Sequence, residues 1–214
     1  MIKYTPLLIS AIFLLMACGE RETFARIDTN VGSVKVKLYN STPLHRDNFV
    51  KLASEGYYDS LLFHRVMPNF MIQAGDPASK LAPQGQRLGG GGPNYTIPPE
   101  ISAPHFKGAL SAARKADQFN PERESSGSQF FIVHGSQQRD ENLDLMERSK
   151  GIQYTAEQRA LYKELGGYPS LDTEYTVFGE VIEGLEVVDE IAGYATDQWN
   201  RPLKEVRITS IEIL

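Results

Sequence analysis

The stretch that decides the fold runs from residue 63 to residue 76 and reads Phe63-His64-Arg65-Val66-Met67-Pro68-Asn69-Phe70-Met71-Ile72-Gln73-Ala74-Gly75-Asp76. A second informative stretch, residues 127–132, reads Gly-Ser-Gln-Phe-Phe-Ile. The first stretch lies in residues 57–108, where short apolar segments are broken by glycine and proline. Short apolar segments separated by glycine and proline are typical of short strands and turns.

Upstream of the first stretch, the sequence predicts two strands and then a helix. Residues 23–29 and 33–39 alternate apolar and polar side chains around a turn at Asn30-Val31-Gly32, which indicates a β-hairpin with one buried face. Thr42 and Pro43 then indicate a helix start, with a hydroxyl N-cap and proline at the first helical position. The apolar positions that follow at helical spacing, and the glycine expected to end the helix, are Leu44, Phe49, Leu52, Ala53 and Gly56.

Downstream of the second stretch, residues 136–169 are polar and helix-favouring and are flanked by strand-like segments. A capping-box sequence begins at Thr155, and Leu161 and Leu165 give the helix that follows a narrow apolar stripe. Because residues 136–169 contain too few apolar side chains for a core of their own, they predict a helical insertion packed on one domain. The final elements expected are a helix near residues 185–192 and a strand at 205–214.

Composition and charge exclude several classes of protein. The chain has 214 residues, 41% of them hydrophobic and 23% charged, and a net charge of −5, which argues against a disordered chain and against a nucleic-acid binder. Its single cysteine excludes an internal disulfide and a CxxC motif. The histidines form neither HExxH nor a close pair, so no metal site and no cofactor is expected. No G-x-S-x-G motif marks a nucleophilic serine, and no carboxylate pair is singled out for glycosidase chemistry.

The two informative stretches closely resemble the signature blocks of the cyclophilins, a family of peptidyl-prolyl cis-trans isomerases. Gly108-Ala109-Leu110-Ser111-Ala112-Ala113 and Tyr175-Thr176-Val177-Phe178-Gly179 match two further blocks in the same order. The resemblance covers residues 23–214, interrupted by 136–169. It implies a mainly β fold, a closed eight-stranded antiparallel β-barrel capped by two helices, and closure would remove the exposed strand edges.

The same resemblance implies isomerisation of X-Pro bonds, a reaction in which no bond is broken. Resonance holds the X-Pro bond planar, with a barrier of about 18–20 kcal/mol. As the amide twists, the prolyl nitrogen regains a lone pair that a guanidinium can bind, and an interaction made only in the twisted state lowers the barrier. The resemblance assigns this catalytic role to Arg65 and assigns Gln73 to positioning Arg65.

The resemblance also assigns substrate-binding residues, in three groups. An apolar pocket takes the proline ring, a pair of glutamines holds the substrate backbone, and a strand-like segment binds the peptide through its main chain. In that order, these residues are Phe70, Met71, Phe131 and Leu171; Gln129 with Gln73; and Ala113 with Arg114. Tyr175 completes the set where many members carry histidine, Arg114 replaces a common asparagine, and Ser170 stands where vertebrate members carry tryptophan.

The amino-terminal residues carry a different signal. A short basic start precedes the apolar residues 7–16, and the small residues around Cys18 follow, which is the pattern of a secretory signal peptide. Leu15-Met16-Ala17-Cys18 also resembles the lipobox of bacterial lipoproteins. The segments expected are a lipoprotein signal peptide at 1–17, a lipidated Cys18, and a tether at 18–22. The domain would then be membrane-anchored in the cell envelope, outside the cytoplasm, although a plain signal peptide with an incidental Cys18 is the alternative.

Three functions stay open from the sequence. The leading one is a lipid-anchored prolyl isomerase that acts as a monomer on proline-containing polypeptides. The second is a non-catalytic module, a proline-peptide binder or chaperone on the same fold, which would have no reason to keep Arg65. The third is a barrel carrier of a small apolar ligand, which leaves residues 63–76 unexplained.

Overall fold

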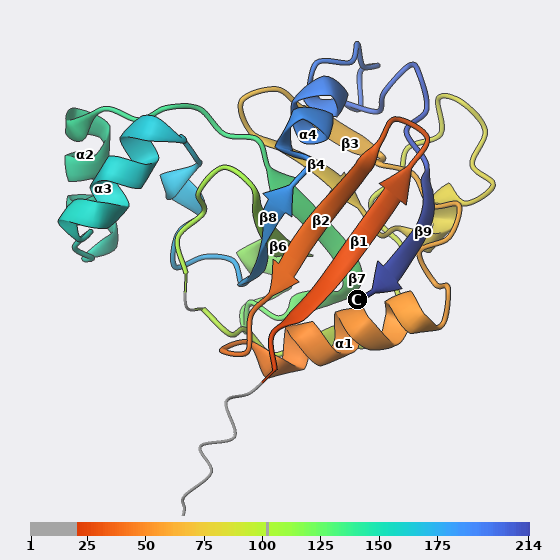
Figure 1. The fold of residues 1–214 in the computed structure, drawn as a ribbon, viewed down its shortest axis with the longest axis horizontal. Helices are drawn as coiled ribbons and strands as arrows, with labels where there is room; N and C mark the ends of the chain where they lie inside the picture. The colour runs from red at the N-terminus through yellow and green to blue at the C-terminus, as the bar shows by residue number, and fades with distance from the viewer. Residues whose placement is uncertain (1–20, 102) are drawn as a thin grey trace, which may run out of the picture.

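The computed structural model describes residues 21–101 and 103–214, and one antiparallel sheet dominates them (Figure 1). Its strands are β1 (Thr23–Thr29), β2 (Ser33–Leu38), β3 (Arg65–Met67), β4 (Met71–Ala74), β5 (Thr96–Ile97), β6 (Ala109–Arg114), β7 (Ser125–Val133), β8 (Val177–Glu183) and β9 (Ile208–Ile213). Eight of these strands follow one another in the order β3-β4-β7-β6-β8-β2-β1-β9, and the short β5 pairs with β7. The mainly β, eight-stranded antiparallel prediction is therefore confirmed.

β1 and β2 form the predicted hairpin. Ala25 lies opposite Val36 and Ile27 lies opposite Val34, and all four side chains are buried. The alternation of apolar and polar residues in the sequence predicts this burial, because successive side chains of a strand point to opposite faces. β1 has the predicted bounds, and β2 ends one residue before the predicted end.

The sheet curls into a half-barrel, and the prediction of a closed barrel is wrong in this respect. β3 and β9 are the two ends of the ladder and do not pair with each other along their lengths. In the described residues, a bridge between Leu62 and Arg207 and a bond from Phe63 N to Val206 O of 2.9 Å join the segments that precede these strands. Because β3 has three residues, this edge is too short to form a continuous ladder with β9.

Two helices, α1 (Pro43–Ser54) and α4 (Leu185–Ala192), cover the sheet as expected. α1 packs against β7, β8 and β9, whereas α4 packs against β2, β3 and β4, so the two helices lie toward opposite ends of the sheet in Figure 1. The core between sheet and helices includes Phe49, Phe130 and Ile191. Phe49 meets the Phe130 ring edge-on at 5.5 Å, a favoured aromatic geometry.

α1 begins at the predicted Pro43, but its buried face differs from the prediction. Leu44 is exposed, and His45 is buried in its place together with Phe49 and other core residues. The reason is the distant Glu100, whose carboxylate accepts hydrogen bonds from Leu44 N (3.2 Å) and His45 N (3.0 Å) and lies 2.7 Å from His45 Nδ1. This carboxylate satisfies the first free N–H groups of the helix.

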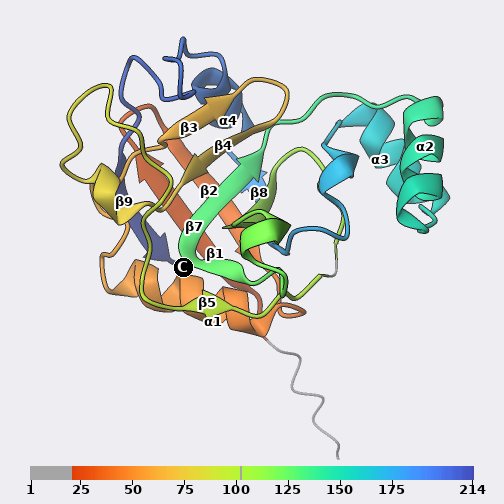
Figure 2. The same ribbon diagram turned by 180° about the vertical axis from the view of Figure 1, so that it is seen from behind.

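α2 (Asp140–Lys150) and α3 (Ala156–Glu164) lie together at one side of the half-barrel, within residues 136–169 (Figures 1 and 2). The predicted capping box is present, since the side chains of Thr155 and Gln158 accept from each other's backbone N–H. The predicted apolar stripe is wrong. Leu165 is exposed, and the buried residue of α3 is Tyr162, which packs with Leu143 in a small cluster.

Nothing in residues 21–101 and 103–214 forms a helix with both the length and the apolar character that a membrane crossing needs. The predicted signal peptide and Cys18 lie outside the described residues. The end of the predicted tether contacts the β2 region: Asn40 Nδ2 donates to Arg21 O at 3.4 Å, and Lys37 pairs with Glu22.

Candidate active site

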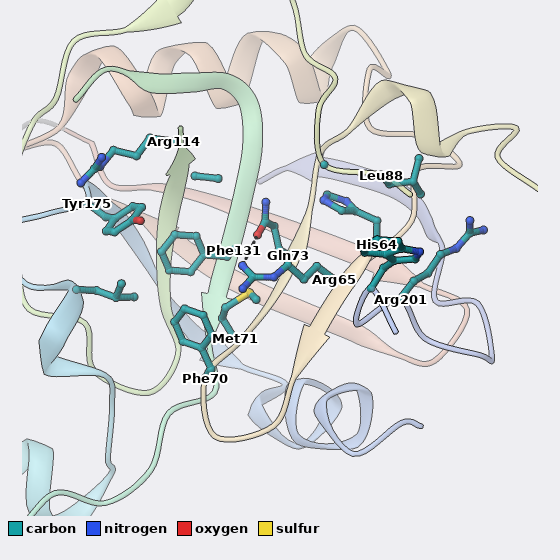
Figure 3. A pocket seen from close by; sticks show the side chains of 14 residues that line it. His64, Arg65, Phe70, Met71, Gln73, Leu88, Arg114, Phe131, Tyr175 and Arg201 are labelled. Carbon is teal, nitrogen blue, oxygen red and sulfur yellow. Dashed lines mark hydrogen bonds between the residues drawn. The ribbon is translucent and has the colours of Figure 1, made fainter. Parts of the chain in front are cut away.

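A cleft of about 260 Å³ collects most of the residues that the sequence predicted for the site (Figure 3). Nine of the ten predicted residues line it, namely Arg65, Phe70, Met71, Gln73, Ala113, Arg114, Phe131, Leu171 and Tyr175. The tenth, Gln129, lines a neighbouring cavity of about 530 Å³ that shares Gln73, Ala113 and Arg114 with the cleft. The fold therefore gathers this set in one place, while the role of each residue stays a prediction.

Strand register places three of these residues in a row. Arg65 on β3 lies opposite Gln73 on β4, and Gln73 lies opposite Phe131 on β7. Directly opposed residues of adjacent strands point to the same face of a sheet. Val66 and Ile72, the alternate residues of β3 and β4, are fully buried in the core. The β3–β4 hairpin thus supplies core on one face and the cleft on the other.

Arg65 lies between polar and apolar neighbours. Its Nη1 donates to Gln73 Oε1 at a long 3.4 Å, its Nη2 lies 3.1 Å from Met67 Sδ, and its guanidinium is 5.5 Å from the centre of the Phe70 ring. Burial lowers the pKa of Arg65, and the negative form of Tyr175 would oppose that shift. Arginine remains charged under all ordinary conditions, so the cleft contains a cation with donors to offer.

A chain of amide contacts fixes the polar side of the cleft. Gln73 Nε2 donates to Gln129 Oε1 at 2.9 Å, and Gln129 Nε2 donates to Gly91 O at 2.6 Å and Gly89 O at 3.1 Å. The carboxylate of Asp76 accepts from Gly89 N at 2.6 Å, which holds the same loop from its other side. The glycine-rich loop at residues 89–92 therefore supports the two glutamines through its backbone carbonyls.

The apolar pocket lies beside Arg65. Met71, Phe131 and Leu171 are buried, and Phe70 is half-buried. The Tyr175 ring stands at 83° to the Phe131 ring, with 5.8 Å between their centres. This arrangement offers a small cyclic apolar group a surface next to a hydrogen-bond donor.

Arg114 takes a larger part in the cleft than its predicted main-chain role. Its side chain is 5% exposed, its guanidinium lies 4.6 Å from the centre of the Tyr175 ring, and its Nε donates to Glu174 O at 2.8 Å. An arginine stacked on an aromatic ring is a favourable contact. Arg114 therefore holds Tyr175, and both residues stand at positions where the chain departs from the common family residues.

The residues at the other end of the cleft were not predicted from the sequence. Beyond Arg65, the lining continues through His64, Leu88, Gly89, Trp199 and Arg201. Arg201 is buried and donates to Ala82 O and Pro83 O, so it joins two segments that are far apart along the chain. Trp199 is the single tryptophan of the sequence and lies partly exposed beneath the guanidinium of Arg87. The presence of a single tryptophan was the signal that the sequence offered for this end.

Three of the four histidines, His45, His64 and His105, are buried. His45 and His105 are buried beside Glu100 and Asp172, and burial lowers the pKa of His64 to about 4 while nearby Asp76 opposes the shift. Among the residues that the structure describes, no group of three His, Cys, Asp or Glu side chains could hold a metal ion. The lining of the cleft offers hydrogen-bond donors of Arg65 beside an apolar pocket.

Comparison with known proteins agrees with this geometry. The family model described as "Cyclophilin type peptidyl-prolyl cis-trans isomerase/CLD" matches residues 24–213. A Staphylococcus aureus (strain USA300) protein named as a peptidyl-prolyl cis-trans isomerase is 36% identical over 186 residues, which cover 86% of this chain and 88% of that protein. A Streptococcus pyogenes protein named as a bifunctional phosphatase/peptidyl-prolyl cis-trans isomerase is 37% identical, and the match covers 87% of this chain but 38% of that longer protein.

Solved structures show the same fold. A Cryptosporidium parvum cyclophilin type peptidyl-prolyl cis-trans isomerase superposes with a TM-score of 0.65 at 26% identity, over 91% of this chain and 98% of that one. The same protein in the presence of the dipeptide Ala-Pro gives a TM-score of 0.64. Half-barrel and cleft therefore define an enzyme of the peptidyl-prolyl cis-trans isomerase class. Within that class, the chain belongs to the cyclophilin-type family.

Proposed function

We propose that this enzyme accelerates X-Pro isomerisation by binding the proline ring in the apolar pocket and donating a hydrogen bond from Arg65 to the prolyl nitrogen. The observation that carries the proposal is the position of the Arg65 guanidinium, at the edge of the pocket and 5.5 Å from the Phe70 ring. The Ala-Pro dipeptide used with the Cryptosporidium relative supports a proline-containing ligand.

The proposed mechanism uses the difference between the planar and the twisted amide. In the planar amide, resonance occupies the nitrogen lone pair, and Arg65 has little to bind. Once the bond twists, the lone pair localises on nitrogen and accepts a hydrogen bond from the guanidinium. Because this bond exists only near the transition state, it lowers the barrier instead of tightening ground-state binding. Gln73, joined to Gln129, restricts the directions that Arg65 can take.

The test is prolyl exchange on an X-Pro peptide with the wild type, Arg65→Ala and Arg65→Lys. Loss of one transition-state donor costs about 10²–10³-fold in rate, so we expect Arg65→Ala to lose about 100-fold in kcat/KM and Arg65→Lys to recover part of it. Arg26→Ala is the matched control, because Arg26 is an exposed arginine on β1. Equal rates for wild type and Arg65→Ala would remove Arg65 from the mechanism.

A binding measurement separates this enzyme from the non-catalytic module. Trp199 lines the cleft and is the only tryptophan in the sequence, so its fluorescence can follow peptide binding directly. We expect Arg65→Ala to bind the peptide within about threefold of the wild type, since the lost interaction belongs to the twisted state. Peptide binding by a wild type that shows no exchange would favour the non-catalytic module.

We further propose that the enzyme works outside the cytoplasm, as a monomer held to a membrane through a lipidated Cys18. The support is the sequence pattern that ends in Leu15-Met16-Ala17-Cys18 and the position of Arg21 and Glu22, which contact Asn40 just after β2 and Lys37 on β2. Its substrates would then be proline-containing polypeptides that fold in the cell envelope.

A further inference from the structure

Residues 136–169 leave and rejoin the half-barrel at one closed base beside the cleft. Ser136 and Gly167 exchange backbone hydrogen bonds of 3.0 and 3.2 Å. Gly167 has a φ of +155°, and a Cβ there would lie 2.4 Å from His105 O, so the chains approach too closely for a larger residue. The base of this segment is therefore a fixed part of the fold.

Tyr168 follows this base and lies against the proline pocket. Its ring centre is 4.4 Å from that of Phe70, with 39° between the ring planes, so the two rings are in direct contact. Its backbone N–H donates to His105 O at 2.8 Å, and its carbonyl accepts from Leu171 N at 3.0 Å. Tyr168 is thus held on both sides of its backbone while its ring supports the outer wall of the pocket.

A buried carboxylate holds the helices of the same segment to the pocket. Asp172, next to the pocket residue Leu171, accepts hydrogen bonds of 2.6 Å from the hydroxyls of both Tyr154 and Tyr162. Its other oxygen accepts from His105 N at 2.7 Å and lies 2.9 Å from His105 Nδ1. All four residues are buried, and both oxygens of the Asp172 carboxylate are engaged by hydrogen-bonding neighbours, which restricts the positions that these side chains can take.

The same network lies behind the pocket floor. The His105 ring is nearly parallel to the Phe131 ring, at 12° and 6.2 Å between centres. The segment therefore meets the pocket at two places, through Tyr168 on Phe70 and through Asp172 with His105 behind Phe131.

We infer that Tyr168 is a positioning residue of the isomerase, and that the hydrogen bonds from Tyr154 and Tyr162 to Asp172 hold residues 136–169 as a built wall of the proline pocket. This inference rests on the proposed function. Phe70 is both a wall of the pocket and the ring beneath the Arg65 guanidinium. Tyr168 limits the rotamers of Phe70, so it acts on the substrate and on Arg65 through Phe70.

The first experiment compares exchange kinetics of the wild type, Tyr168→Ala and Tyr168→Phe. Loss of one aromatic pair corresponds to about a three- to tenfold change in an equilibrium constant. We therefore expect Tyr168→Ala to raise KM at least about threefold, and to lower kcat/KM by more than the rise in KM alone would. Tyr168→Phe keeps the ring and should restore both values. Leu165→Ala, an exposed change in the same segment, is the control and should match the wild type.

The rise in KM is the decisive readout. A merely structural defect lowers the fraction of folded enzyme and hence kcat, but leaves KM unchanged. An unchanged KM in Tyr168→Ala, or no recovery in Tyr168→Phe, would overturn the positioning role. If instead the wild type shows no exchange, the proposed function fails, and the inference is then judged by peptide affinity from Trp199 fluorescence in the same variants, where an unchanged affinity in Tyr168→Ala overturns it.

The second experiment removes two hydroxyls and nothing else. The double variant Tyr154→Phe/Tyr162→Phe keeps both rings in the cluster with Leu143 but takes two donors from Asp172. We expect KM to rise in the same direction as in Tyr168→Ala, together with faster hydrogen exchange at the amide of Leu171. A double variant with wild-type KM and wild-type exchange at Leu171 would overturn the proposed role of the network.

Discussion

Arg65 and His64 are neighbours in sequence, yet burial affects their chemistry in different ways. Burial lowers the pKa of both side chains. For Arg65 the lowered pKa is without consequence, because arginine keeps its charge at any pH at which the fold persists. For His64 the ordinary pKa lies near neutrality, so burial decides its charge in the folded protein. The proposed donor is thus insensitive to pH, whereas the stability of the site around it is not.

His64 should make the protein less stable in mild acid. Burial lowers its pKa from 6.5 to about 4, so between these values the unfolded chain binds a proton that the folded chain does not. The free energy of unfolding therefore falls as the pH falls from 6.5 to 4, by about 3 kcal/mol from this residue. Urea unfolding at several pH values should show a shallower pH dependence for His64→Gln than for the wild type.

His134→Gln is the control for this experiment, because His134 is more exposed than His64 and should contribute a smaller slope. Identical pH dependences for the wild type and His64→Gln would show that His64 does not carry the effect.

At the scale of the elements, α1 depends on a residue outside the helix. Thr42 occupies the N-cap but makes no side-chain cap bond, and its hydroxyl donates to Tyr39 O at 3.3 Å. Glu100 provides the capping interaction instead, through Leu44 N and His45 N. Glu100 N in turn donates to Thr176 Oγ1 at 2.9 Å. One loop residue therefore connects the start of α1 to the segment that leads into β8.

Glu100→Ala should destabilise the fold through α1. The change leaves two backbone N–H groups and the buried His45 without their acceptor, and loss of a cap or of a charged hydrogen bond costs about 1–2 kcal/mol. Urea unfolding should show this loss, and hydrogen exchange should speed up in the first turn of α1. Glu122→Ala, at an exposed loop position, is the matched control. An unchanged unfolding free energy in Glu100→Ala would contradict the capping role.

Elements were predictable where local pattern decides them. β1 follows from its alternation of apolar and polar side chains, and both β1 and α4 have the predicted bounds. Leu44 and Leu165 were wrongly predicted to be buried, because partners outside the helices decide which helix face is buried. His45 is buried beside Glu100, and Tyr162 is buried with its hydroxyl bonded to Asp172. No spacing within a helix records a partner that is remote in the sequence.

For the whole molecule, eight of the ten predicted site residues meet because the four sequence blocks that contain them form adjacent strands and loops of one sheet. The resemblance supplied residues inside those blocks and two residues near them, Arg114 and Leu171. Trp199 and Arg201 come from the segment before β9, and Tyr168 comes from residues 136–169. Because these three residues lie outside the blocks, only tertiary packing brings them to the cleft.

The same separation along the chain allows anchoring and catalysis to be tested independently. The described fold begins at Arg21, the ten site residues lie at or beyond Arg65, and the sequence has no second cysteine. Cys18→Ser should therefore abolish labelling by radioactive palmitate and move the protein from the membrane to the soluble fraction, because each buried methylene of an acyl chain contributes about 0.8 kcal/mol to anchoring. The released protein should exchange X-Pro bonds at the wild-type rate. A wild type that is already soluble and unlabelled would favour a plain signal peptide, and a slower Cys18→Ser enzyme would contradict the independence of the two functions.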